Sequence, residues 1–256
     1  RYLGREPKPR LQITTRGEIP QQHYRIEKFP ECAQLEQSLG LAGALGLENP
    51  YFQVHQGVLN NRTMIGGRQL VNFSSFNYIG MSGHPAVSRA AKDAIDRYGT
   101  SVSASRLVSG EKDLHRQLEE AIARFLGTKD AMIFSAGHST NETVIGHLFG
   151  PGDLILHDAL AHNSILQGAI LSGARRRAFA HNNPQAADRL LAEHRRQYRR
   201  VLVAIEGVYS MDGDVPDVPR FIEIKRRHKA ILFIDEAHSL GTMGPQGRGM
   251  AEYFAV

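Results

Sequence analysis

From about residue 85 onward, the chain alternates between amphipathic segments with helical spacing and short apolar runs. Apolar residues recur every three or four positions over 85–98 and 113–126, which predicts two helices. The first has Pro85 in its first turn, and Gly127 directly follows the second, as is typical of helix boundaries. Short apolar runs of β-rich composition are expected to form strands at 131–134, 154–156, 201–205 and 231–234.

Strands that alternate with helical stretches are typical of βαβ units and a mainly parallel sheet. The sequence therefore predicts an α/β fold with helices flanking the sheet. Functional residues in such folds gather beyond the carboxyl ends of the strands. Polar clusters fall at four such positions, namely 135–138, 157–158, 206–207 and 235–238.

The N-terminal part has a different pattern, rich in Pro, Gln, Arg and Lys and with little apolar periodicity. A helix is expected around 31–45, and short strands within 51–73 are expected to meet at a turn formed by Gly66 and Gly67. We therefore expect three parts: a linker or extended arm (1–30), an N-terminal segment (31–75) and the sheet domain (76–256).

Composition places the chain among ordinary globular proteins, with 41% hydrophobic and 22% charged residues. A single cysteine, Cys32, allows no intrachain disulfide, which favours a reducing, cytoplasmic location. No apolar run reaches the roughly 18 residues of a membrane-spanning helix, and no signal peptide opens the sequence. The chain begins with Arg1 rather than methionine, so we expect its N-terminus to have been cut or processed.

The net charge is +5, from 31 basic and 26 acidic residues, and the basic residues cluster at 175–177, 195–196, 199–200 and 225–229. Solvated helix faces and strand ends are the commoner interpretation of such clusters. The alternative is a docking surface for an acidic partner, such as an acyl carrier protein or the phosphates of coenzyme A. Nucleic acid is not expected, because no aromatic residues are interleaved and no recognition motif occurs.

One strand is followed by a constellation suited to a charged heterocycle. The apolar run 231–234 leads directly to Asp235, and His238 follows three residues later. A carboxylate there can hold a positive charge on a ring nitrogen, and an imidazole can bond a phenolate-type oxygen. The same letters, Asp-Glu-Ala-His, occur in some helicases, but the phosphate loop that an ATPase needs is absent from this sequence.

Three further polar turns offer candidate contacts to a cofactor. Gly137 would open a helix whose N-terminus can bind a phosphate, although such small-residue turns are usually only turns. His162 could stack on a flat ring, and the alternative is an ordinary surface histidine. Ser210 could donate to a cofactor oxygen, and the alternative is a hydroxyl that only stabilises its turn. His157, Asp158 and His162 suit a metal by residue type, but no fourth ligand is evident and we expect no metal.

Together these motifs resemble the α-oxoamine synthase family, which includes aminolevulinate synthase, 8-amino-7-oxononanoate synthase, 2-amino-3-ketobutyrate ligase and serine palmitoyltransferase. The stretches that carry the resemblance occur in the family's order: 72–80, 98–110, 158–164, 206–214 and 233–249. The resemblance implies the pyridoxal-phosphate (PLP) transferase fold of type I. It also implies that the family's C-terminal small domain is missing from this chain, so that the PLP-binding large domain 76–256 is incomplete.

The resemblance also implies a role for individual residues around PLP. Asp235 would pair with the pyridine nitrogen, His162 would stack on the ring, and His238 would contact the phenolate oxygen; these three are the candidate catalytic residues. The other implied contacts are Ser210 to the phenolate oxygen, the backbone of Gly137 and His138 to the phosphate, and Asn77 and Glu206 on the substrate side. His138 stands where many relatives carry an aromatic residue, and it keeps a flat ring.

The activity that the resemblance implies is a PLP-dependent acyl transfer. An amino acid condenses with an acyl thioester, carried by coenzyme A or an acyl carrier protein, usually with loss of carbon dioxide, to give an α-amino ketone. Such enzymes are usually homodimers. The sequence leaves open which amino acid and which acyl donor are used, and whether decarboxylation occurs.

One departure from the family concerns its Schiff-base lysine, which lies a few tens of residues after the aspartate. None of the seven lysines of this chain follows Asp235. We therefore expect the chain to be an inactive excerpt of a longer protein, with the linker-like start suggesting a multidomain, polyketide-type enzyme. The alternatives are an aminotransferase of the same fold and a non-catalytic partner subunit of a heteromeric synthase. The retention of Asp235, His162 and His238 argues against the partner subunit.

Overall fold

The computed structural model describes residues 18–47, 49 and 51–256, so the first 17 residues of the expected linker lie outside the described part. The chain forms two compact units, which meet in sequence between Asn72 and Phe73.

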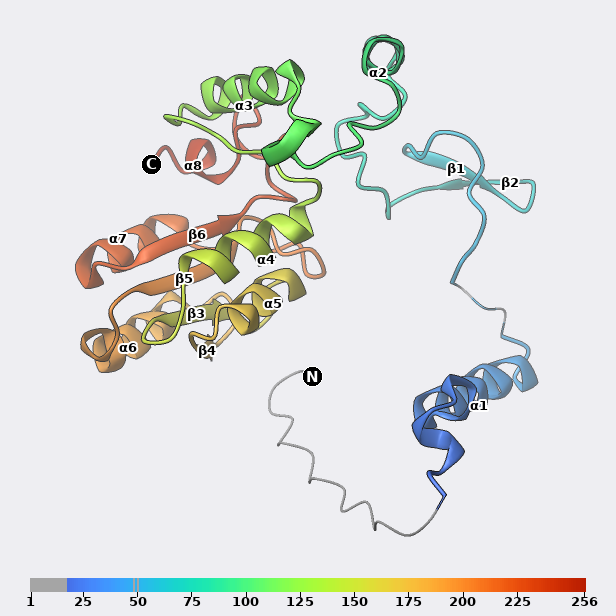
Figure 1. The fold of residues 1–256 in the computed structure, drawn as a ribbon, viewed down its shortest axis with the longest axis horizontal. Coiled ribbons are helices and arrows are strands. Elements are labelled where there is room, and N and C mark those ends of the chain that lie inside the picture. Colours follow the sequence, from blue (N-terminus) through green and yellow to red (C-terminus); the bar gives the residue numbers. More distant parts are fainter. Residues whose placement is uncertain (1–17, 48, 50) are drawn as a thin grey trace. The chain divides into compact units, whose positions relative to one another are not determined.

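The first unit contains one helix and one small hairpin (Figure 1). Its elements are the 3-10 turns η1 (Gln21–His23) and η2 (Ile26–Lys28), helix α1 (Pro30–Ala44) and strands β1 (Arg62–Ile65) and β2 (Arg68–Val71). The strands are antiparallel, with Thr63 opposite Leu70. Gly66 and Gly67 form the connecting turn with φ values of 55° and 77°, a conformation that favours glycine. The predicted helix and turn are confirmed.

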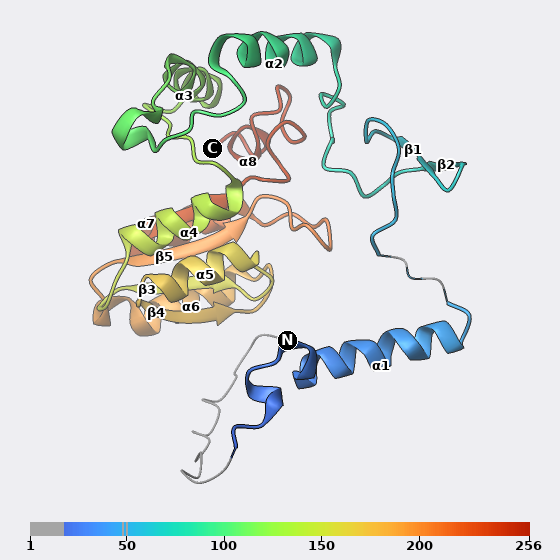
Figure 2. The same cartoon turned by 45° about the vertical axis from the view of Figure 1, so that its right-hand side comes forward.

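The second unit is built around a four-stranded parallel sheet in the order β4-β3-β5-β6 (Figures 1 and 2). Its strands are β3 (Leu154–Asp158), β4 (Arg175–Phe179), β5 (Val201–Glu206) and β6 (Ile231–Asp235). The helices that flank them are α4 (Gly137–Leu148), α5 (Asn163–Leu171), α6 (Pro184–His194) and α7 (Val218–His228). The remaining elements are α2 (Pro85–Tyr98), η3 (Arg106–Gly110), α3 (Asp113–Leu126), η4 (Arg195–Gln197) and α8 (Met250–Tyr253). The predicted α/β architecture with a parallel sheet is confirmed.

Both faces of the sheet are buried along its central strands β3 and β5, which explains why the apolar residues of these strands do not alternate with polar ones. Successive residues of β5 point to opposite faces: Val203 packs in a core with α6 and α7, and Leu202 packs in a second core with α4 and α5. Both residues are 1% exposed. Figure 1 shows the helix pairs on the two sides of the sheet. The sheet therefore provides a rigid base for whatever follows the ends of its strands.

The prediction of a strand at 131–134 is wrong, because side chains occupy its backbone groups. The N–H of Ile133 donates to Oε1 of Glu119 at 3.1 Å, and Arg106 donates to the Ile133 carbonyl at 3.5 Å. Arg106 also forms an ion pair with Glu119, 2.6 Å apart, and this hydrogen bond and the Ile133 N–H lower the pKa of Glu119 to about 2. Within the part of the chain that the structure describes, this segment pairs with no strand.

Strand β4 was not predicted, because its first residues are three consecutive arginines. It is an edge strand that pairs with β3, and Arg175 and Arg176 are exposed. Charged residues are common on sheet edges, where they discourage pairing with another chain. The basic cluster 175–177 is therefore a strand, in line with the commoner interpretation of these clusters as strand ends and helix faces.

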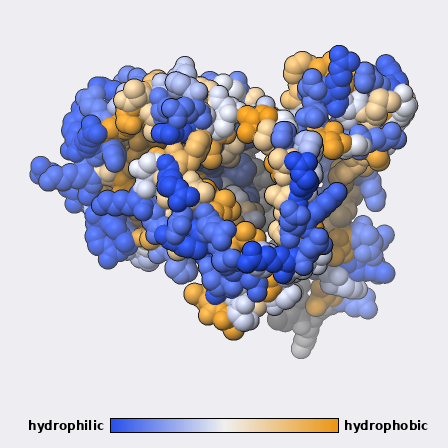
Figure 3. Space-filling view, turned by 90° about the horizontal axis from the view of Figure 1, so that it is seen from above, coloured by the Kyte–Doolittle hydropathy of each residue, from blue (hydrophilic) through white to orange (hydrophobic). Residues whose placement is uncertain are grey.

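Several large apolar side chains of the second unit reach the surface. Phe73, Leu107, Val108 and Met211 are each at least 84% exposed. Figure 3 shows hydrophobic residues between hydrophilic ones on the face it presents. Single exposed apolar side chains are common on protein surfaces, and only a contiguous patch of them indicates a surface that binds another protein. None of the described helices is long and apolar enough to cross a membrane.

Candidate functional site

A cavity of about 420 Å³ lies beyond the carboxyl ends of β5 and β6 and beside the starts of α4 and α5. Six of the eight residues expected at the site line it: Gly137, His138, His162, Glu206, Asp235 and His238. These residues come from segments up to about 100 positions apart, and the parallel sheet brings them to one edge. This is the position at which α/β folds bind ligands.

Two carboxylates stand side by side at this edge. Glu206 ends β5, Asp235 ends β6, and the two are paired in the sheet register. Burial raises the pKa of Glu206 to about 7, and the neighbouring charge of Asp235 adds to the effect. Glu206 is 3% exposed and accepts the backbone N–H of His162 at 2.6 Å. The pair is therefore only partly ionised near neutral pH.

Asp235 is held by donors on both of its oxygens. Oδ1 accepts the backbone N–H of Ala237 at 3.0 Å, and Oδ2 accepts the side-chain amide of Asn141 at 2.7 Å. Asn141 belongs to α4 and is 7% exposed. These two bonds fix the carboxylate at the mouth of the sheet without cancelling its charge.

His162 is the N-cap residue of α5, and its ring is fixed at Nδ1. Nδ1 accepts the backbone N–H of Ser164 at 3.3 Å and lies 2.7 Å from the Ser164 hydroxyl. The His138 ring stands almost perpendicular to it, with ring centroids 5.6 Å apart. His162 therefore presents a flat ring whose orientation is set by the start of its own helix.

The start of α4 provides a place for an anion. The helix is 12 residues long, and its N-cap residue, Ala136, makes no side-chain capping bond. A Cβ added at Gly137 would meet nothing within 4 Å, so the backbone there faces open space. Free N–H groups and the positive end of the helix dipole favour a phosphate at such a point.

A second cavity of about 530 Å³ adjoins the first and shares Ala237, His238 and Leu240 with it. Asn77 lines this second cavity, and its Oδ1 accepts the backbone N–H of Ser82 at 2.9 Å. The Tyr78 hydroxyl bonds Nδ1 of His238 at 2.5 Å. His238 therefore stands between the two cavities, with Tyr78 holding its ring.

Ser210 is not among the residues that line either cavity. It is exposed in the turn after β5, and its backbone N–H bonds Glu206. The structure thus brings seven of the eight expected residues to the two cavities and leaves the Ser210 side chain outside them.

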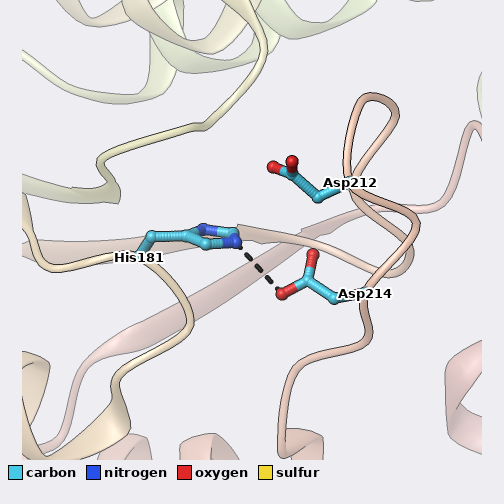
Figure 4. A group of neighbouring side chains, drawn as sticks. All are labelled: His181, Asp212 and Asp214. Carbon is cyan, nitrogen blue, oxygen red and sulfur yellow. Dashed lines mark hydrogen bonds and ion pairs between the residues drawn. The ribbon is translucent and has the colours of Figure 1, made fainter.

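A separate polar network joins the ends of β3 and β4 to the turn after β5. His181 bonds the fully buried Asp158 through Nδ1 at 2.7 Å. It bonds Asp214 through Nε2 at 3.0 Å (Figure 4). Burial opposes the charge on His181, but the two carboxylates outweigh it and raise its pKa. Asp212 lies close enough to share a cation with His181 and Asp214. The metal set considered from the sequence, which included His157 and His162, differs from this group.

Three residues near the cavities were not expected: Asn141, Ser164 and Tyr78. Asn141 stands four positions after Gly137, which places both on one side of α4. Ser164 follows His162 by two positions, the spacing of an N-cap bond. These spacings were available in the sequence, but only the packing of α4 against α5 shows that they meet.

Residues 68–254 match the model of the family described as aminotransferase class I and II. A relative from Geobacter sulfurreducens, 8-amino-7-oxononanoate synthase, is 46% identical over 200 residues, which are 78% of this chain and 51% of the relative. Human serine palmitoyltransferase 3 is 41% identical over 198 residues, 74% of this chain and 36% of the relative. The chain thus spans about a third to a half of the curated relatives it matches.

The chain is also similar to solved structures of serine palmitoyltransferases. A serine palmitoyltransferase from Sphingomonas wittichii superimposes with a TM-score of 0.82 and 35% identity, covering 88% of this chain and 56% of that one. A serine palmitoyltransferase variant from S. paucimobilis, with bound PLP–myriocin aldimine, gives 0.83 and 32%, covering 88% and 58%.

Proposed function

Because the chain belongs to the aminotransferase class I and II family, we propose that its cavity binds PLP. The observation that carries the proposal is the carboxylate of Asp235, held by two donors at the end of a parallel strand and facing a cavity that His162 also lines. A negative charge fixed in this way suits a protonated ring nitrogen.

The donor set of the cavity fits the whole cofactor. In the proposed arrangement Asp235 holds the proton on the pyridine nitrogen, His162 lies against the ring face, and the first N–H groups of α4 at Gly137 and His138 bind the phosphate. When bound, PLP acts as an electron sink for the bond that is broken at the α-carbon of an amino acid.

The remaining site residues are assigned to the oxygen of the ring and to the substrate. We propose that His238, whose ring Tyr78 holds, contacts the phenolate oxygen. The motif assigns Ser210 to the same oxygen, and the turn after β5 would have to bring its side chain into the cavity, outside which it lies here. Asn77 and Glu206 are proposed to face the substrate. Since the pKa of Glu206 is near 7, its carboxyl group can hold or release a proton close to neutral pH.

The reaction that we propose for the whole protein is the condensation of an amino acid with an acyl thioester, carried by coenzyme A or an acyl carrier protein, usually with decarboxylation. It is supported by the relatives, which are named as 8-amino-7-oxononanoate synthases and serine palmitoyltransferases. An aminotransferase and a non-catalytic partner subunit remain the alternatives.

Three further features are part of the proposal. A homodimer is proposed from the resemblance to the α-oxoamine synthases, with the adjacent exposed side chains of Leu107 and Val108 as a candidate part of its interface. The division into a linker (1–30), an N-terminal segment (31–75) and a PLP-binding domain (76–256) is retained, as is a cytoplasmic location.

Binding of PLP can be tested on the full 256-residue chain by the circular dichroism that an asymmetric site induces in the cofactor's absorption band. We expect a saturable signal, and Asp235→Ala should weaken binding about 10- to 100-fold, since a hydrogen bond to a charged group contributes about 1.5–3 kcal/mol. Asp93→Ala, at an exposed position of α2, is the matched control. Equal affinity for both variants would refute the assignment of Asp235.

The reaction class is tested by supplying PLP, an amino acid and an acyl-coenzyme A to the longest natural form of the protein, because the 256-residue chain has no lysine after Asp235 and is expected to be inactive. Release of free thiol that depends on the amino acid supports the synthase. Formation of a keto acid without thiol release supports the aminotransferase instead. Binding of PLP with neither product would favour the partner subunit.

A further inference from the structure

Two buried side chains connect Asp235 to His162. The Asn141 amide nitrogen lies 2.7 Å from Oδ2 of Asp235 and 2.9 Å from the Ser164 hydroxyl, which lies 2.7 Å from Nδ1 of His162. Asn141 is 7% exposed and Ser164 is fully buried. The four groups come from the end of β6, from α4 and from the start of α5, and they form one continuous series of hydrogen bonds.

The direction of each bond in the series follows from the chemistry of its end groups. The Asp235 oxygens accept from Ala237 and Asn141, so the Asn141 side chain must turn its amide nitrogen, not its oxygen, toward them. That nitrogen carries two hydrogens, and the second is directed to the Ser164 oxygen. The single hydroxyl hydrogen of Ser164 is then left for His162.

A second donor confirms the state of the histidine. Nδ1 of His162 also accepts the backbone N–H of Ser164 at 3.3 Å, a group that can only donate. A ring nitrogen that receives two hydrogens cannot carry one of its own. In a neutral imidazole the proton is then on Nε2.

We infer that Asn141 and Ser164 are positioning residues that hold His162 as the neutral Nε2–H tautomer, in a direction set by the carboxylate of Asp235. The significance of this inference rests on the proposed function. A neutral imidazole can lie against the cofactor ring without placing a second positive charge beside the protonated ring nitrogen. A charged imidazolium would compete with that nitrogen for the carboxylate of Asp235.

The inference can be tested without any cofactor, by long-range ¹H–¹⁵N correlation spectra of the full chain labelled with ¹⁵N-histidine. The His162 signals are assigned from their loss in His162→Gln. We expect Nδ1 of His162 at the frequency of an unprotonated ring nitrogen and Nε2 at that of a protonated one. In Ser164→Ala, the separation between the two frequencies should shrink as the second tautomer becomes populated.

Ser172→Ala is the matched control, since Ser172 is also a buried hydroxyl of the α5 region but donates to the Ala169 carbonyl. It should lower stability to a similar extent and leave the His162 signals unchanged. Asn141→Leu should shrink the separation as Ser164→Ala does, because the Ser164 hydroxyl then loses the donor that fixes its direction.

Two results would overturn the inference. One is a proton on Nδ1 of His162 in the unmodified protein, which requires no variant to fold. The other is an equal pattern in Ser164→Ala and Ser172→Ala. Failure of PLP to bind in the separate titration would instead refute the proposed function and leave the tautomer assignment standing.

Discussion

The difference in the free energy of unfolding between Glu206→Gln and the unmodified protein should depend on pH. The pKa of Glu206 is raised from 4.5 to about 7, first by burial and then by the charge of Asp235. Because the folded-state pKa lies above the unfolded one, stability is highest at low pH and is lost as pH rises between these two values. Glutamine keeps a carbonyl oxygen for the His162 N–H and never ionises.

The size of the effect follows from the same pKa. At 1.36 kcal/mol per pKa unit, ionising Glu206 in the folded state costs about 3 kcal/mol. Water in the adjoining cavity screens part of this, so we expect Glu206→Gln to be more stable than the unmodified protein by about 2 kcal/mol at pH 8. At pH 4.5 the difference should be below about 0.5 kcal/mol.

Urea denaturation at pH 4.5, 6, 7 and 8 measures the free energy of unfolding of both proteins. Asp93→Asn, at an exposed position of α2, makes the same carboxyl-to-amide change on the surface and should show no trend with pH. If the difference between Glu206→Gln and the unmodified protein is constant from pH 4.5 to 8, the carboxyl group is not destabilised by the fold and the reasoning fails.

Other substitutions test the scaffold and the cavity. Asp153→Ala, which removes a buried carboxylate bonded by two arginines and two backbone N–H groups, should cost about 2–4 kcal/mol in urea denaturation. Gly168→Ala would place a methyl group 2.8 Å from the Asn141 carbonyl and should lower stability by about 1–3 kcal/mol. Gly137→Ala meets no atom, so it should leave stability unchanged while weakening PLP binding in the dichroism titration. The pKa of His181 is raised in the folded state, so its ion pairs contribute fully to the free energy of unfolding below pH 6.5. That contribution is lost as the pH rises through the folded-state pKa of His181. In urea denaturation, His181→Gln should therefore cost more stability at pH 6 than at pH 9.

The elements that the sequence predicted best are those with local boundary signals. The predicted limits of α2 and α3 agree with the structure, because Pro85 and Gly127 set the ends and the apolar spacing sets the face. The resemblance to the α-oxoamine synthases, drawn from short motifs, is likewise confirmed by relatives of that kind. Helix-boundary residues and short motifs can be recognised within one segment, without knowing which other segments pack against it.

The errors lie where distant residues decide the outcome. The apolar run 131–134 has strand composition, yet Glu119 and Arg106 bind its backbone. The arginines of β4 were interpreted as a charge cluster, yet this segment pairs with β3 at the edge of the sheet. Local composition does not determine whether a segment finds a neighbouring strand, because that depends on tertiary packing.

The candidate site divides in the same way. Asp235 and Glu206 could be placed from the sequence, since each directly ends an apolar strand and parallel strands end at a common edge. Asn141, Ser164 and Tyr78 could not, because each matters through a bond to a side chain in another segment. Ser210 was assigned from its motif, and the structure shows its backbone, rather than its side chain, in contact with the site.

The two strand-end carboxylates illustrate how one sheet edge can give similar groups different roles. Asp235 receives an amide hydrogen and a backbone N–H, and its other side faces the cavity. Glu206 is more deeply buried, and its pKa near 7 means that the pair carries fewer than two negative charges at neutral pH. A proton that moves on or off Glu206 would change the field at Asp235 and at the N–H of His162 together. The pH dependence of PLP binding should therefore contain a component that follows Glu206, and Glu206→Gln should remove that component even though Asp235 is untouched.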